Sequence, residues 1–238
     1  MNRTYALVWN PSLGAWSVAN EHARRRGKGA GAVLAAILLL PALASAADLP
    51  TGGQVSAGQG QIGLPANNKM VIDQASNKLA IDWQSFDIAA GNKVTFNQPG
   101  RDAIALNRVL GADGSKIMGQ LDANGRVFIV NPNGVLFGQG AQVNVGGLVA
   151  STLDISNSDF EAGNYAFKGN GKNAAVVNNG KITAADGGSV ALLGGTVSNN
   201  GVIVANQGSV ALAAGNAVTL DFAGDGLLNV QVDEAVVD

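Results

Sequence analysis

Two adjacent stretches, VVNNGKITAADGGSVALLGGT (residues 176–196) and VSNNGVIVANQGSVALAAGN (residues 197–216), are copies of one another. The Asn-Asn-Gly triplet recurs after 21 residues, and Gly-Ser-Val-Ala-Leu recurs after 20. A repeat of this length is the period of one coil of a solenoid, which holds about three short strands separated by turns. The repeat therefore predicts an all-β solenoid in which each strand pairs in parallel with its copy in the next coil.

Stacking of the two copies fixes which side chains meet. Val190 is expected beneath Val210, with both side chains pointing inward by the two-residue alternation of a strand. Asn179 is expected beneath Asn200, where side-chain amides can donate to one another along the column. The expected core is therefore a stack of aliphatic side chains enclosed by short strands.

Two other architectures compete for the same composition. Asn-Gly recurs along the chain, and taken singly it is the strongest hairpin signal, which would indicate an antiparallel sandwich. Leucine-rich or helical repeats are the second alternative, but no helical apolar period runs through this region and the density of Gly disfavours helix. The coil-length copy favours the solenoid over both.

The earlier part of the mature chain alternates in polarity without a coil-length copy. Leu79, Ile81 and Trp83 are expected to face one way on a strand. An open solenoid end must be protected, because an exposed edge strand recruits other chains. We therefore expect residues 47–124 to hold an irregular β-rich cap and the first strands, and residues 125–238 to hold the β-helix coils.

The start of the chain has the pattern of an extended signal peptide, residues 1–46. Residues 1–29 form a basic n-region, with five basic residues against one acidic residue. Residues 30–46, AGAVLAAILLLPALASA, carry no charge and close on small residues. This pattern predicts cleavage between Ala46 and Ala47. A transmembrane anchor and a start codon placed too early are the alternatives, and the small-residue end disfavours the first.

The composition excludes several kinds of active site. The 238-residue chain has no Cys, and its single His, His22, lies in the segment that is expected to be removed. Residues 47–238 therefore offer no Ser-His-Asp or Cys-His nucleophilic site and lack the usual zinc ligands. They contain 10 basic and 16 acidic residues, with the basic ones scattered, which argues against a nucleic-acid partner. We expect no cofactor and no metal.

Paired carboxylates are the remaining route to catalysis. An acid and a base would have to converge in one groove, and no local pattern indicates that they do. Asp82 and Asp87 alternate with apolar residues and are expected on the solvent face of a strand, whereas most others lie in turns. We therefore expect no enzyme. The acidic candidates are Asp73, Asp82, Asp87, Asp102, Asp113, Asp122, Asp154, Asp159, Glu161 and Asp186.

The stretch GRVFIVNPNGVLFGQG (residues 125–140) places two apolar runs on either side of a tight turn. Pro132 fixes φ at the second turn position, and Gly134 permits a positive φ. Asn131 and Asn133 are expected to bond backbone groups that the turn leaves unpaired.

Together these residues resemble a known family. LAIDWQSFDIAAGNKVTFNQPGRDAIALNRVLG (residues 79–111) and IMGQLDANGRVFIVNPNGVLFG (residues 117–138) are similar to the haemagglutination activity domain. This is the amino-terminal secretion domain of filamentous-haemagglutinin-like exoproteins of two-partner secretion systems. The Trp-x-x-Phe element, the Asn-Arg-Val segment and the Asn-Pro-Asn-Gly block occur in that order, within a resemblance over about residues 54–230. The resemblance implies a right-handed parallel β-helix, a single-stranded solenoid with an amino-terminal cap.

The resemblance also implies an export route and its partners. The chain would cross the inner membrane through the Sec translocon and leave the periplasm through a dedicated outer-membrane β-barrel transporter. The resemblance links Asn131, Pro132, Asn133 and Gly134 to secretion. A second family motif, Asn-Pro-Asn-Leu, has no match in this sequence.

The sequence thus predicts a secretion and targeting domain of a large adhesin- or haemagglutinin-like exoprotein, secreted or held at the bacterial cell surface. Its transporter would recognise it, and it would nucleate β-helix folding outside the cell. The alternatives are a stand-alone surface adhesin that binds host glycans and a β-helical polysaccharide-active enzyme. The resemblance implies that such a domain is usually followed by many more coils, and a bare coil end would expose core residues such as Leu228 and Val230.

Overall fold

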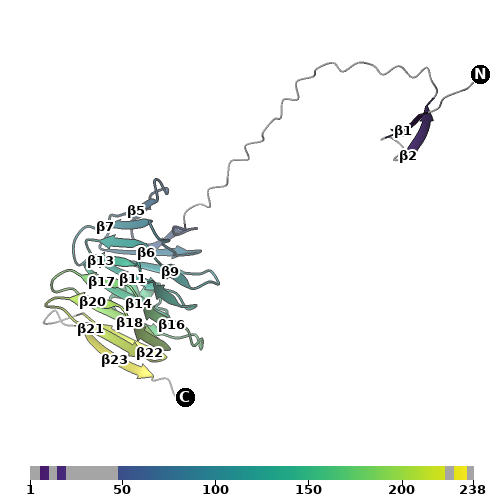
Figure 1. Ribbon diagram of the computed structural model, residues 1–238. Coiled ribbons are helices and arrows are strands. Elements are labelled where there is room, and N and C mark those ends of the chain that lie inside the picture. Colours follow the sequence, from purple (N-terminus) through teal and green to yellow (C-terminus); the bar gives the residue numbers. More distant parts are fainter. Residues whose placement is uncertain (1–5, 11–14, 20–47, 223–227, 235–238) are drawn as a thin grey trace, which may run out of the picture. The chain divides into compact units, whose positions relative to one another are not determined.

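The computed structural model describes residues 6–10, 15–19, 48–222 and 228–234 (Figure 1). The chain consists of two compact units, residues 1–42 and residues 43–238. In the first unit, β1 (Ala6–Asn10) and β2 (Ala15–Ala19) pair as antiparallel strands. The second unit holds the other described strands and the described helix.

The second unit is a parallel β-helix whose strands form three sheets (Figure 1). The first sheet runs β5-β7-β10-β13-β17-β20, the second sheet runs β6-β8-β11-β14-β18-β21, and the third sheet runs β9-β12-β16-β19. Neighbours within each of these runs pair in parallel. The predicted solenoid is therefore confirmed.

The strands of the coils are short, as a coil of this period requires. In the first sheet they are β5 (Lys69–Gln74), β7 (Lys93–Asn97), β10 (Gln120–Ala123), β13 (Gln142–Val145), β17 (Lys181–Ala184) and β20 (Val202–Ala205). In the second sheet they are β6 (Lys78–Trp83), β8 (Ile104–Val109), β11 (Arg126–Val130), β14 (Gly147–Ser151), β18 (Val190–Gly194) and β21 (Val210–Ala214). In the third sheet they are β9 (Ser115–Ile117), β12 (Val135–Phe137), β16 (Ala175–Asn178) and β19 (Thr196–Asn199).

Two strands cover the amino-terminal end of the coils, and each is antiparallel to the coil strand that it pairs with. β3 (Gln54–Ala57) pairs with β6, and β4 (Gly60–Ile62) pairs with β5. This antiparallel segment has the place and the irregularity expected of a cap. The parallel strands begin with β5 at Lys69, so the coils extend back well before residue 125.

The internal copy sets the register of the last two coils as the sequence predicted. Val190 pairs with Val210, and Asn200 Nδ2 donates to Asn179 Oδ1 at 3.2 Å. Val190 is buried, whereas Val210 is 46% exposed, because β21 has no described coil on its far side.

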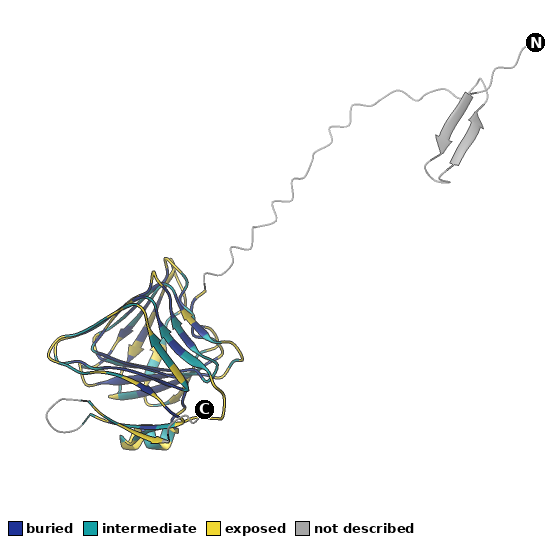
Figure 2. Ribbon diagram, turned by 60° about the horizontal axis from the view of Figure 1, so that its bottom comes forward, coloured by how far each residue is buried: buried dark blue, intermediate teal, exposed yellow. Residues whose placement is uncertain are grey.

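One hydrophobic core fills the inside of the coils. Figure 2 shows that many residues along the strands of the coils are buried. Leu79, Ile81 and Trp83 all belong to it, as the alternation predicted. Trp83 Nε1 donates to Oδ1 of the buried Asn107 at 3.0 Å, so the one polar atom of this ring is satisfied inside the core.

A second hydrophobic core lies on the outer face of the second sheet. The helix α1 (Asn157–Ala162) and an antiparallel outer sheet cover this face; the outer sheet consists of β15 (Tyr165–Lys168), β22 (Ala217–Asp221) and β23 (Asn229–Glu234). Strands β14 and β18 are buried at every position, which fits their sequences, GLVAS and VALLG, in which Ser151 is the one polar side chain. Members of this core include Ala80, Leu106, Phe128, Val149, Phe160, Phe167, Leu193, Val218 and Leu220.

Residues 125–238 hold an outer layer in addition to coils. The chain leaves the coils between β14 and β16 to form α1 and β15, and after β21 it forms β22 and β23. Leu228 and Val230 consequently pack against the second core instead of lying at a coil end. In the last described coil, the exposed large apolar side chains are Val202, Val210 and Leu212.

Candidate functional site

The Asn-Pro-Asn-Gly block forms the corner between β11 in the second sheet and β12 in the third. Gly134 N donates to the carbonyl oxygen of Asn131 at 3.0 Å, which closes a turn with Pro132 at its second position. Gly134 has a backbone φ of +117°, a conformation that residues other than glycine rarely adopt. The predicted turn, with a positive φ at Gly134, is therefore present.

Asn131 is completely buried and holds the corner to the preceding coil. Its Nδ2 donates to the carbonyl oxygen of Asp113 and to Ser115 Oγ, both at 3.0 Å. Its Oδ1 accepts from Asn133 N at 2.9 Å. The amide therefore pairs backbone groups of two coils and the buried hydroxyl of Ser115.

Asn133 joins the same corner to segments on both sides. Its Nδ2 donates to the carbonyl oxygen of Gly111 at 2.9 Å, and its Oδ1 accepts from Lys172 Nζ at 2.8 Å. Lys172 precedes β16, where the chain re-enters the coils after the outer excursion. All amide groups of Asn131 and Asn133 are thus hydrogen-bonded within the folded domain, a set of partners that the sequence alone did not reveal.

Most of the candidate carboxylates do not converge. Asp87 lies between two isolated bridges, and its Oδ1 accepts from Lys116 N at 2.7 Å, so its expected place on the face of a strand is wrong. Asp82 does lie on a strand, but it is half-buried and 3.1 Å from Arg108 Nη1. The expectation of a plain solvent face for Asp82 is wrong because α1 covers part of this sheet.

Two of the candidate carboxylates share a cation. Asp82 and Asp154 both pair with the Arg108 guanidinium, at 3.1 and 2.9 Å. Asp122 contacts Lys93 Nζ at 2.5 Å. Burial alone would raise the pKa of Asp122, but hydrogen bonds from Lys93, Asn144 and Gln120 hold that pKa below its ordinary value.

The described residues contain no cluster of three His, Cys, Asp or Glu side chains that could hold a metal ion. Among those same residues, no helix has the length and apolar character needed to cross a membrane. The expected cleavage site, Ala46 and Ala47, lies outside the described part of the chain.

Comparisons with known proteins place these features in a family. Residues 46–235 match the TPS secretion domain, and residues 1–48 match the extended signal peptide of the type V secretion system. The crystal structure of the HMW1 secretion domain from Haemophilus influenzae superposes with a TM-score of 0.70 at 34% identity, over 79% of this chain and 50% of that one.

Two curated relatives are heme/hemopexin-binding proteins of Haemophilus influenzae. One is 43% identical over 156 residues, covering 60% of this chain and 17% of that protein, and the other is 42% identical over 139 residues, covering 58% and 15%. The chain thus spans less than a fifth of the length of these relatives. The TPS secretion domain and the extended signal peptide together imply Sec-dependent export and a cognate outer-membrane transporter. The chain belongs to the TPS secretion domain family, the secretion domains of two-partner-secretion exoproteins that pass through the periplasm to the cell surface.

Proposed function

We propose that residues 47–238 are the targeting domain of an adhesin- or haemagglutinin-like exoprotein, which one dedicated β-barrel transporter recognises. The match of residues 46–235 to the TPS secretion domain carries this proposal. Co-expression with candidate transporters tests it: the chain should reach the medium with one of them and stay in the periplasm without it. Equal release in the absence of every transporter would contradict the proposal.

In this proposal the domain also nucleates β-helix folding outside the cell. Each coil that joins the stack buries a ring of apolar side chains, which stabilises it at about 25 cal/mol per Å² of apolar surface. The folded stack therefore has a lower free energy than the emerging chain, and this difference favours movement outward.

Three further activities fit the domain less well. Ligation of heme, which the names of the two relatives suggest, would lack the commonest ligands, because residues 47–238 contain no His and no Cys. Host-glycan binding usually uses exposed aromatic rings, and the exposed large apolar side chains of the described residues are all aliphatic. Catalysis would need an unpaired acid and base, whereas Asp82 and Asp154 are both bound to Arg108.

We expect the mature amino terminus to be Ala47. The uncharged run of residues 30–46 ends on Ala44-Ser45-Ala46, the small-residue pattern that signal peptidase cleaves. Amino-terminal sequencing of the exported product measures the cleavage position. Recovery of a product that still carries Arg24–Arg26 would contradict the proposed site.

We propose that the Asn-Pro-Asn-Gly block supports secretion through the stability of its corner. Gly134→Val places a β-branched residue at φ +117°, which costs on the order of 1–3 kcal/mol. Asn133→Ala removes the bonds to Gly111 and Lys172 and should cost about 0.5–1.5 kcal/mol. Urea unfolding and secreted yield should therefore fall together, with Gly134→Val the more severe change.

The rival explanation is that the transporter reads the block while the chain is extended. Asn133→Ala separates the two, since it changes a side chain and leaves the backbone conformation accessible. If this variant keeps wild-type stability in urea but is not secreted, direct recognition replaces the stability explanation.

A further inference from the structure

Residues 153–168, which we name the latch, leave the coils after β14 and return to much earlier ones. Ser156 caps α1 at its amino end, and Gly163 with φ +84° ends it. Lys78 in β6 then donates from Nζ to the carbonyl oxygens of Phe160 and Glu161, each at 2.8 Å. Both carbonyls lie at the carboxyl end of a helix, where a cation is favourable.

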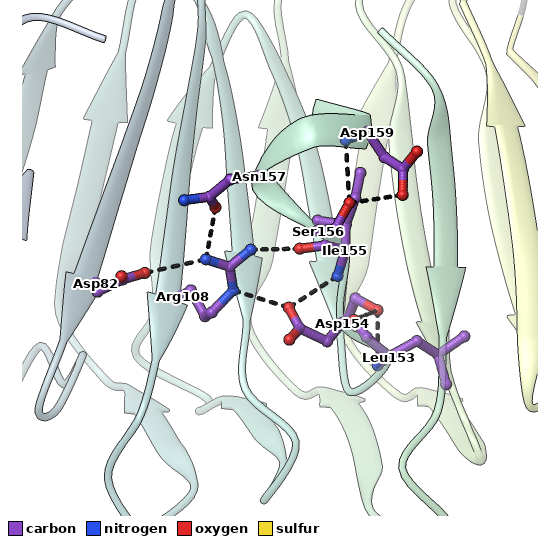
Figure 3. Close-up of polar contacts among 9 residues, drawn as sticks. Asp82, Arg108, Leu153, Asp154, Ile155, Ser156, Asn157 and Asp159 are labelled. Carbon is purple, nitrogen blue, oxygen red and sulfur yellow. Dashed lines mark hydrogen bonds and ion pairs between the residues drawn. The ribbon is translucent and has the colours of Figure 1, made fainter. Parts of the chain in front are cut away.

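Arg108 in β8 holds the other end of α1 (Figure 3). Its Nε donates to Asp154 Oδ1 at 2.9 Å, its Nη1 donates to Asn157 Oδ1 at 2.8 Å, and its Nη2 donates to the carbonyl oxygen of Ile155. The same guanidinium contacts Asp82 of β6, and its side chain is only 11% exposed. One arginine therefore joins β6 and β8, the first two parallel strands of the second sheet, to three residues of the latch.

Apolar packing accompanies these polar contacts. Phe160 is fully buried and Ile155 is 1% exposed, and both belong to the core on the outer face of the second sheet. That core also contains Ala80 of β6 and Leu106 of β8. The latch thus removes from water the outer face of strands whose inner face the coils already bury.

Contacts of this range are unusual for a repeat architecture. In a solenoid each coil normally contacts only its neighbours, so stability is close to a sum of local terms. We propose that the latch holds the coils of β6 and β8 closed, so that these first coils become stable only when residues 153–168 are in place. The first coils would then not fold stably by themselves before residues 153–168 have joined them.

This inference bears on export, where it rests on the proposed function. A chain that emerges gradually would keep its first coils open until the latch had also emerged. The latch itself is tested on purified protein without a transporter, so its failure and the failure of the proposed function are separate results.

The experiment is hydrogen exchange of the purified processed chain, followed by mass spectrometry. The variant Asp154→Ala with Asn157→Ala removes two Arg108 partners from the latch and leaves β6 and β8 unchanged in sequence. Because hydrogen bonds to a charged group are the stronger kind, we expect amides of β6 and β8 to exchange roughly tenfold faster. Amides of β17 and β18 should change by less than about twofold.

A matched control removes the same two residue types from the open first sheet. Asp122→Ala with Asn144→Ala removes the contact of Asp122 with Lys93 Nζ at 2.5 Å. It also removes the hydrogen bond that Asn144 Nδ2 donates to Asp122 Oδ1 at 3.0 Å between neighbouring coils. It should leave exchange in β6 and β8 within about twofold of wild type. Unchanged exchange in β6 and β8 of the latch variant overturns the proposal. Equal acceleration in all coils, or the same acceleration with the control, also overturns it.

Discussion

Replacing Phe128 by alanine is expected to lower the free energy of unfolding by about 3–5 kcal/mol, the usual cost of truncating a buried aromatic ring. Phe128 is 1% exposed and points from β11 into the outer core. Its ring centroid lies 5.6 Å from that of Tyr165 and 6.0 Å from that of Phe222. Both partners come from the outer layer, so the cavity would open between this layer and the coils.

Urea unfolding of the processed chain, followed by far-UV circular dichroism and tryptophan fluorescence, measures this loss. Trp83 is then the one tryptophan left, because Trp9 and Trp16 lie in the signal peptide. Leu110→Ala is the control, since Leu110 is 65% exposed and should change stability by no more than about 0.5 kcal/mol. A cost below about 1 kcal/mol for Phe128→Ala would show that the outer layer is not packed on the second sheet in solution.

The sequence was sufficient for the coils because their determinants are local and periodic. The copied stretches fixed the pairing of Val190 with Val210. Alternation placed Leu79 and Trp83 inside. Both arguments need only the spacing of residues along the chain.

The outer layer could not be predicted in the same way. Strand β18, VALLG, is apolar on both faces, which shows that something covers it but not what. The helix α1 has six residues, too few for an apolar period to stand out, and its clearest signal is the cap formed by Ser156. Asp82 shows the limit of alternation, since a polar residue on the outer face of a strand can be covered by a layer that the alternation does not reveal.

The Asn-Pro-Asn-Gly corner was predictable in shape and not in its contacts. Pro132 and Gly134 indicate a turn through their own backbone restrictions. Lys172, by contrast, reaches Asn133 from a segment 39 residues away. Partners brought together by the coil stacking have no spacing in the sequence that would reveal them.

Asn131→Ala is expected to be the most damaging single change within that corner, with a loss of about 2–4 kcal/mol in the free energy of unfolding. Asn131 is 0% exposed, so water cannot replace its amide without opening the corner. The substitution leaves the carbonyl of Asp113, Ser115 Oγ and the amide of Asn133 without their partner. Ser115 is buried, and a buried polar group left unpaired costs about 1–3 kcal/mol, whereas the part-buried groups of Asp113 and Asn133 cost less.

The matched control for Asn131→Ala is Asn144→Ala, which removes an exposed amide that contacts Asp122 at 3.0 Å. It should cost no more than about 0.5 kcal/mol in urea unfolding and leave the secreted yield unchanged. Since Asn131 is buried, a transporter could read its side chain only before the domain folds. A stable but unsecreted Asn131→Ala variant would therefore place recognition in the unfolded chain, whereas parallel losses of stability and yield assign the motif to the folded corner.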